Sequence, residues 1–116
     1  MSTTAHGNWT GQIKAAITVT DANGKIIEMN PGSIEVFKAD GGAKVIGSDI
    51  FACHQEPSRT KLRTMYHEQK PNHYTITKNG QRKIIHQVPL FQDGKFAGFV
   101  EISLQIPEKM PHFNRD

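Results

Sequence analysis

The hydrophobic and polar positions near the start of the chain alternate in two short runs joined by a turn. Residues 16–20 alternate small and β-branched side chains, and residues 25–29 resume the same pattern. Between them lies the segment Asp21–Gly24, whose glycine supplies the positive φ that tight turns require. This pattern predicts a β-hairpin.

Helical signals follow in the middle of the chain. Asn30–Pro31 is typical of a helix N-terminus and predicts a short helical segment after the hairpin. Residues 39–47 are rich in glycine and predict a loop with at most one helical turn. A longer helix is expected between Pro57 and Pro71, with apolar side chains at i, i+3 and i+4 spacing: Leu62, Met65 and Tyr66.

Alternation returns in the last part of the chain. It predicts strands at residues 73–77, 82–90 and 96–106, separated by Gly-containing turns. Hairpins on both sides of a helical region indicate an antiparallel sheet with segregated helices, which is an α+β fold. We therefore expect a domain at residues 15–106, preceded by a polar lead-in at residues 1–14 and followed by a tail at residues 107–116.

Composition narrows the class of protein. With 116 residues, of which 36% are hydrophobic, the chain is expected to form one small globular domain. The 14 basic residues outnumber the 11 acidic ones, but they are scattered singly, so nucleic acid is not an expected partner. A single cysteine cannot form an intramolecular disulfide, and no run of about 18 apolar residues could span a membrane. These features predict a cytoplasmic protein.

Three segments in the right order resemble a known family. Residues 17–31 resemble the opening of a PAS domain, where a first strand ends in Asp, turns through Gly and returns to Asn before a helix. Gly47–Phe51 is similar to the entry to the short central helix of the family, and residues 92–100 resemble its last hairpin. The match covers residues 15–106 and implies a five-stranded antiparallel sheet with short helices and one longer helix on one face. It also implies a sensory or interaction role.

A narrower resemblance concerns one short segment. Phe51–Ser58 looks like the C-H-P-x-x-S element of a PAS subgroup from bacterial proteins, with Gln55 at the position of the Pro. Haem-binding PAS domains carry their axial His shortly after the Pro that opens the longer helix, and residues 59–63 contain no His. Flavin-binding photosensor domains need an Asn-Cys-Arg-Phe-Leu-Gln context, which Cys53 lacks. Haem and covalent flavin are therefore disfavoured, and the cofactor stays unassigned.

Candidate catalytic chemistry is sparse. The phosphate-loop, zinc-protease and serine-hydrolase motifs are all absent from the sequence, so no catalytic residue is assigned and we do not expect an enzyme. Cys53 and His54 could form a nucleophilic pair or a metal site. Neighbouring side chains diverge on a helix or a strand, however, so we favour a buried Cys53 and a loop or cap role for His54, with no metal site.

By analogy with PAS domains, a ligand cavity is expected between the helices and the sheet. Alternation places His86 and Val88 on one face of their strand. If this face points toward the helices, His86 could anchor a ligand carboxylate, and the alternative is a cross-strand partner on an exposed or dimer-covered face. The residues expected to line the cavity are Ile17, Val19, Met29, Phe37, Phe51, His54, Leu62, Met65, His86 and Val88.

These observations favour a sensory or signalling module that binds a small molecule, mediates protein–protein interaction, or does both. The last two strands carry more apolar residues than one helix layer can cover, so a homodimer is expected, unless Trp9 and the lead-in cover part of this surface. Because one domain leaves no room for an output unit, we expect either that a downstream signalling protein is a partner or that the chain is a fragment of a larger sensor. The alternatives are a dimerisation module without a ligand, and a small metal or thiol protein that uses Cys53 and His54.

Overall fold

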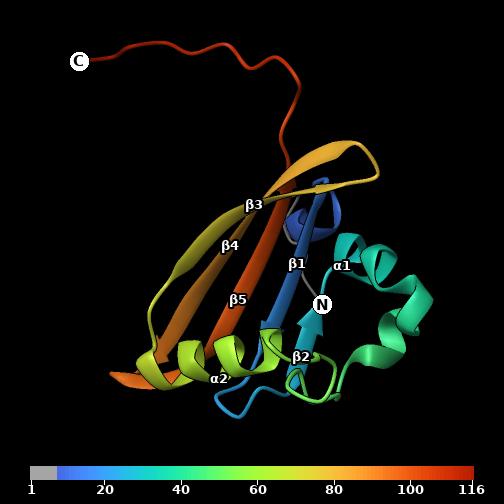
Figure 1. Cartoon of the computed structure of the whole chain (residues 1–116), viewed down its shortest axis with the longest axis vertical. Coiled ribbons are helices and arrows are strands. Elements are labelled where there is room, and N and C mark those ends of the chain that lie inside the picture. Colours follow the sequence, from blue (N-terminus) through green and yellow to red (C-terminus); the bar gives the residue numbers. More distant parts are fainter. Residues whose placement is uncertain (1–7) are drawn as a thin grey trace.

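The computed structural model describes residues 8–116, and its centre is a five-stranded antiparallel sheet in the order β2-β1-β5-β4-β3 (Figure 1). This arrangement confirms the expected α+β fold class. The strands are β1 (Ala15–Thr20), β2 (Ile26–Met29), β3 (Asn72–Lys78), β4 (Gln81–Gln92) and β5 (Lys95–Gln105). The helices are α1 (Pro31–Val36) and α2 (Ser58–Glu68), with short 3₁₀ turns η1 (Trp9–Gly11), η2 (Lys38–Asp40) and η3 (Gly42–Val45).

The first and last strands of the chain lie side by side in the middle of the sheet. β1 pairs with β5, and the Thr18↔Glu101 pair fixes their register. Glu101 in turn pairs with Gln87 of β4, and Gln87 pairs with Asn72 of β3. Residues directly opposite one another in neighbouring strands point to the same face. One row of side chains therefore crosses four strands on a single face of the sheet.

Helix α1 is held at its N-terminus by Asn30. The side chain of Asn30 accepts a hydrogen bond from the Ser33 N–H at 2.9 Å and from the Ile17 N–H at 2.8 Å. The same side chain donates to the carbonyl oxygens of Thr10 and Ala15, both at 2.8 Å. The predicted cap is confirmed, and it also joins α1 to strand β1.

Helix α2 crosses the face of the sheet that carries Thr18, Glu101 and Gln87, and it lies near one end of the strands (Figure 1). It ends at Glu68, slightly before the expected stop at Pro71, and the capping residue Gln69 has a left-handed conformation. Two 3₁₀ turns occupy the glycine-rich segment, where at most one helical turn was expected. Gly47–Phe51 resembles the entry to a short central helix, but residues 50–53 form turns and no regular helix follows directly.

Two apolar clusters form the core. Phe51, Leu62, Tyr66 and Phe99 join α2 to the sheet. Ile26, Met29 and Val45 join β2 to η3, with Ile34 and Phe37 packed against them. The last residues of the chain leave the end of β5 and extend away from the sheet (Figure 1). Within residues 8–116, no helix is long and apolar enough to cross a membrane.

Candidate functional site

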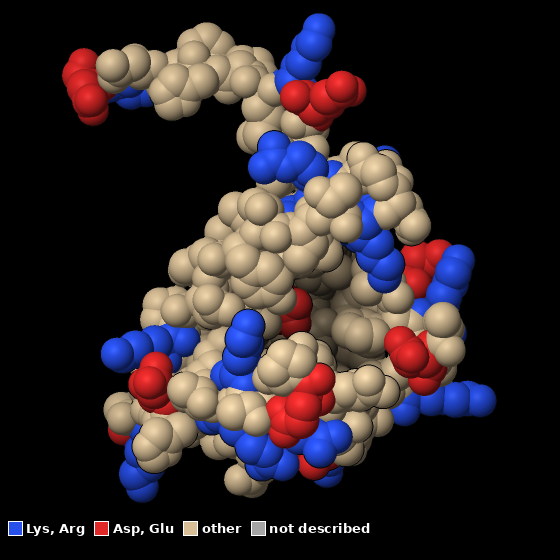
Figure 2. Space-filling view, in the orientation of Figure 1, with Lys and Arg blue, Asp and Glu red and all other residues tan. Residues whose placement is uncertain are grey.

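A groove of about 780 Å³ separates α2 from β3 and β4. Figure 2 shows this face hollowed, with acidic surface inside the hollow. Leu62 and Tyr66 of α2 pack in the core beneath the helix, with Met65 beside them, and the groove lies next to this contact. The groove is lined by His54, Ser58, Thr60, Lys61, Leu62, Thr64, Met65, Glu68, Lys70, Pro71, Asn72, Tyr74 and Gln87.

A much smaller recess of about 20 Å³ lies between α2 and the central strands. Leu62, Met65 and Gln87 line both spaces, so the recess adjoins the groove. The remaining lining residues of the recess combine apolar and oxygen-bearing side chains: Thr18, Thr20, Ile50, Tyr66, Phe99 and Glu101. The two spaces together form a candidate binding site with an apolar wall and a polar floor.

The polar floor is a row of side chains with a hydrogen-bonded pair at each of its ends. Asn72 Nδ2 donates to Gln87 Oε1 at 2.9 Å on one side. On the other side the hydroxyl groups of Thr18 and Ser33 are 2.5 Å apart. Glu101 lies between these two pairs, and no hydrogen bond or ion pair to its carboxylate occurs among residues 8–116. The floor therefore presents an unpartnered carboxylate.

Burial raises the pKa of the Glu101 carboxyl above its ordinary value, and the nearby His54 imidazole opposes this increase in part. Burial likewise raises the pKa values of Tyr66 and Tyr74, to which the charge of Glu101 contributes. His54 Nδ1 lies 2.8 Å from the Ile50 carbonyl oxygen. Because a carbonyl only accepts, Nδ1 carries the proton and Nε2 is left for other partners.

We expect Glu101→Gln to stabilise the unliganded protein at neutral pH. A carboxyl whose pKa is raised by folding stabilises the fold below its unfolded pKa, and this contribution is lost as pH rises through the folded pKa. Gln cannot ionise, so the unfolding free energy of the variant should exceed that of the wild type by about 1 kcal/mol at about pH 8. The difference should shrink toward about pH 4. Urea unfolding at both pH values measures it.

Glu28→Gln is the matched control for removal of one negative charge, because Glu28 lies exposed on β2. A Glu101→Gln variant that is less stable than the wild type at neutral pH would contradict the description of Glu101 as a half-buried carboxylate without a hydrogen-bond partner within residues 8–116.

Six of the residues expected to line a cavity lie on the inner side of the sheet or beside it. His54, Leu62 and Met65 line the groove. Phe51 belongs to the apolar cluster beneath α2, against which Met65 also packs. Met29 and Phe37 are in the second cluster with Ile26 and Val45, and neither lines the groove or the recess. The structure thus divides this group between two separate parts of the core.

The other four expected residues face the opposite side of the sheet: Ile17, Val19, His86 and Val88. Their chain neighbours Thr18 and Gln87 point toward α2, and successive side chains in a strand alternate between faces. The expected common lining is therefore corrected. The expectation failed because β4 has no purely apolar face, so its alternation did not show that Gln87 points inward. His86 is a cross-strand partner: its Nδ1 lies 2.8 Å from Nδ1 of His73.

Cys53 is exposed, which corrects the expectation of a buried thiol, because it lies in a turn before α2 and not in the core. Its neighbour His54 directs Nδ1 toward the Ile50 carbonyl. Within the described part of the chain, no group of three or more His, Cys, Asp or Glu side chains is placed to hold a metal ion.

Sequence reasoning missed the polar floor of the site. Glu101 is a charged residue between Val100 and Ile102 in the long apolar strand β5. A charge inside such a strand signals either an exposed face or a functional position. The apolar residues of β5 dominate its pattern and conceal this signal. The one acidic residue among them, Glu101, was the position that could have indicated the site.

Comparisons with solved structures identify the fold. The Aer2 receptor of Vibrio cholerae, described as a dual PAS-haem oxygen sensor, matches with 15% identity over 80% of this chain and 95% of that one, at a TM-score of 0.64. A PAS domain from Colwellia psychrerythraea matches with 21% identity over 86% and 92% of the two chains, at 0.60. A sensory box sensor histidine kinase from Vibrio cholerae matches with 13% identity over 83% and 85%, at 0.59.

The chain therefore has the PAS fold. No family model matches the sequence, and no curated protein is a significant relative. The narrower resemblance of Phe51–Ser58 to a bacterial PAS subgroup stays a prediction.

Proposed function

We propose that this protein is a cytoplasmic sensory or signalling module, without enzymatic activity, that binds a small molecule between α2 and the sheet. The observation that carries the proposal is the groove of about 780 Å³ with its adjoining recess. This volume lies in the range of about 300–1,000 Å³ that is typical of small-molecule sites. The PAS fold supports a sensory role, since the Aer2 receptor and the sensory box kinase, which share that fold, are described as sensors.

The means of signal output is part of the proposal. Ligand binding would alter the position of α2 relative to the sheet, and a partner protein would respond to the change. A second copy of the chain is the partner expected on the opposite face of the sheet. That face carries partly exposed apolar side chains on three neighbouring strands: Ile17, Val19, Val88, Val100 and Ile102.

A single substitution that fills the groove tests the binding proposal. Met65 is half-buried and lines both the groove and the recess, so Met65→Trp should occupy the space a ligand needs. We expect compounds from a diverse library to raise the Tm of the wild type by several degrees at saturating concentration. These shifts should vanish in Met65→Trp. Differential scanning fluorimetry followed by native mass spectrometry measures the shift, the bound mass and the oligomeric state.

His67→Trp is the matched control, because His67 lies exposed on the same helix and lines neither space. It should retain every ligand-induced shift. If no compound raises the Tm, and mass spectrometry finds only unliganded dimers, the dimerisation alternative holds and ligand sensing is wrong.

A further inference from the structure

We propose that the recess binds a primary ammonium group of the ligand, with Glu101 as its counter-charge, while the groove holds an apolar ligand body. This inference rests on the proposed function and assigns the chemical class of the ligand. Its starting point is the position of Glu101 on the central strand β5, at the floor of the recess.

The carboxylate of Glu101 lacks a partner in a row that is otherwise paired. Asn72 Nδ2 donates to Gln87 Oε1, and the hydroxyl groups of Thr18 and Ser33 are hydrogen-bonded to each other, whereas Glu101 forms no such bond within residues 8–116. Glu101 is half-buried, so its carboxylate is only partly hydrated, and a donor or a cation beside it would offset the lost hydration. Within residues 8–116 the one ion pair joins Lys38 to Glu35, far along the sequence from this site. The proposed ligand supplies an N–H donor to this carboxylate, whose one charged neighbour of opposite tendency within residues 8–116 is the His54 imidazole.

The size of the recess selects the head group. A volume of about 20 Å³ is close to that needed by one water molecule, for which roughly 10–15 Å³ suffices. An ammonium group has a similar size, whereas a guanidinium or a trimethylammonium group is several times larger. The recess accordingly favours a primary amine over bulkier cations.

The oxygen atoms of the recess match the donors of an ammonium group, which carries three N–H bonds. Glu101 supplies a carboxylate, and Thr18 and Thr20 supply hydroxyl oxygens that also line the recess. Thr18 is bonded to Ser33, which leaves a further lone pair on its oxygen, whereas Thr20 is bonded to the Tyr66 hydroxyl and also accepts from the Phe99 N–H at 3.4 Å. The Glu101 carboxylate and the Thr18 hydroxyl are therefore acceptors on the same small space, and Thr20 adds a third when its own hydroxyl donates to Tyr66.

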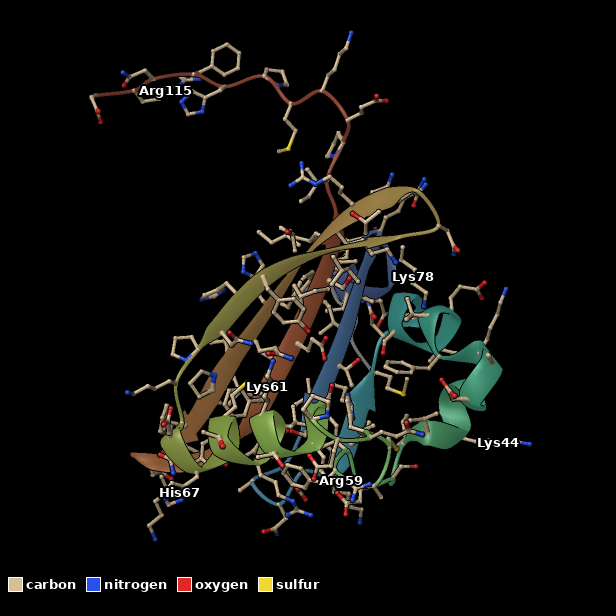
Figure 3. The ribbon with its side chains drawn as sticks, in the orientation of Figure 1. Lys44, Arg59, Lys61, His67, Lys78 and Arg115 are labelled. Carbon is tan, nitrogen blue, oxygen red and sulfur yellow. The ribbon has the colours of Figure 1, made fainter. Side chains whose placement is uncertain are left out.

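The groove determines the rest of the ligand. Leu62 and Met65 line both the groove and the recess, and Phe99 also lines the recess. The part of the ligand next to the ammonium group therefore meets apolar surface. Figure 3 shows Lys61 on α2, and this side chain lines the groove but not the recess. The ligand class is an amine with an apolar or aromatic body.

Isothermal titration calorimetry on the full chain at about pH 8 and low salt tests the assignment, because ionic attraction is then least screened. The probes are phenethylamine, phenethyl alcohol and trimethylphenethylammonium, which share one body and differ in the head group. We expect phenethylamine to bind at least about tenfold more tightly than either of the others. Glu101→Gln should reduce this preference to about threefold or less.

Glu28→Gln is the matched control, since Glu28 lies exposed on β2 and lines neither the groove nor the recess, and it should keep the preference. Equal affinity for amine and alcohol would overturn the inference and leave small-molecule binding intact, as would an amine preference that survives in Glu101→Gln. If none of the three probes binds, although library compounds still bind the wild type and not Met65→Trp, the inference alone is wrong. If no library compound binds the wild type either, both the inference and the proposed function are wrong.

Discussion

Replacing Gly98 by alanine is expected to cost about 4 kcal/mol or more of unfolding free energy, enough to unfold a marginal domain of this size. Gly98 lies in β5 with φ of +128°, a conformation that residues with a side chain rarely adopt. A Cβ atom at this position would lie 1.9 Å from the Thr20 carbonyl oxygen of β1. Backbone atoms cannot move aside as a flexible side chain would, so the central pairing of β1 with β5 must open.

Gly94→Ala separates strain from the clash. Gly94 also has a positive φ, of +77°, but a Cβ atom added there would meet nothing within 4 Å. We expect this control to cost about 1–2 kcal/mol from backbone strain alone. Urea unfolding followed by circular dichroism compares the two variants. Equal stabilities would contradict the close approach of β1 and β5 at Gly98.

Replacing Asn30 by alanine is expected to cost roughly 3–4 kcal/mol, because four hydrogen bonds of about 1 kcal/mol each are lost from a buried side chain. The loss exceeds that of an ordinary helix cap, for which about 1 kcal/mol is typical. Asn30 also holds the N–H of Ile17 and the carbonyl of Ala15, so α1 should detach from β1.

Asn23→Ala is the matched control, since Asn23 lies exposed in the turn between β1 and β2 and should change stability by less than about 0.5 kcal/mol. Amide hydrogen exchange should show that the protection of the Ile17 N–H falls in Asn30→Ala. If Asn30→Ala is as stable as Asn23→Ala, the role of Asn30 as a link between α1 and β1 is wrong.

Most of the secondary structure could be predicted from the sequence because its signals are local. The turn at Asp21–Gly24, the cap at Asn30 and the helix before Pro71 each depend on residues a few positions apart. The strands expected at residues 82–90 and 96–106 form, at Gln81–Gln92 and Lys95–Gln105. The PAS-like order of elements followed from the same local signals.

The candidate site could be predicted only in part. Leu62 and Met65 were found because helical spacing identifies the face of α2 that packs on the sheet. Ile17, Val19, His86 and Val88 were placed on the wrong face for contact with α2, since alternation fixes which residues share a face but not where that face points. The exposed position of Cys53 depends on a turn with no strong local signal.

Local sequence signals were enough to define the strands, the two helices and the class of fold, because hydrogen-bonded turns, caps and periodic hydrophobic positions act over short distances. The face of each strand that meets α2 depends on tertiary packing, and so does the position of Glu101 between two hydrogen-bonded polar pairs. This dependence arises because β1, β4 and β5 come together from distant parts of the chain. Their register places Thr18, Glu101 and Gln87 in one row, and no local pattern encodes that row.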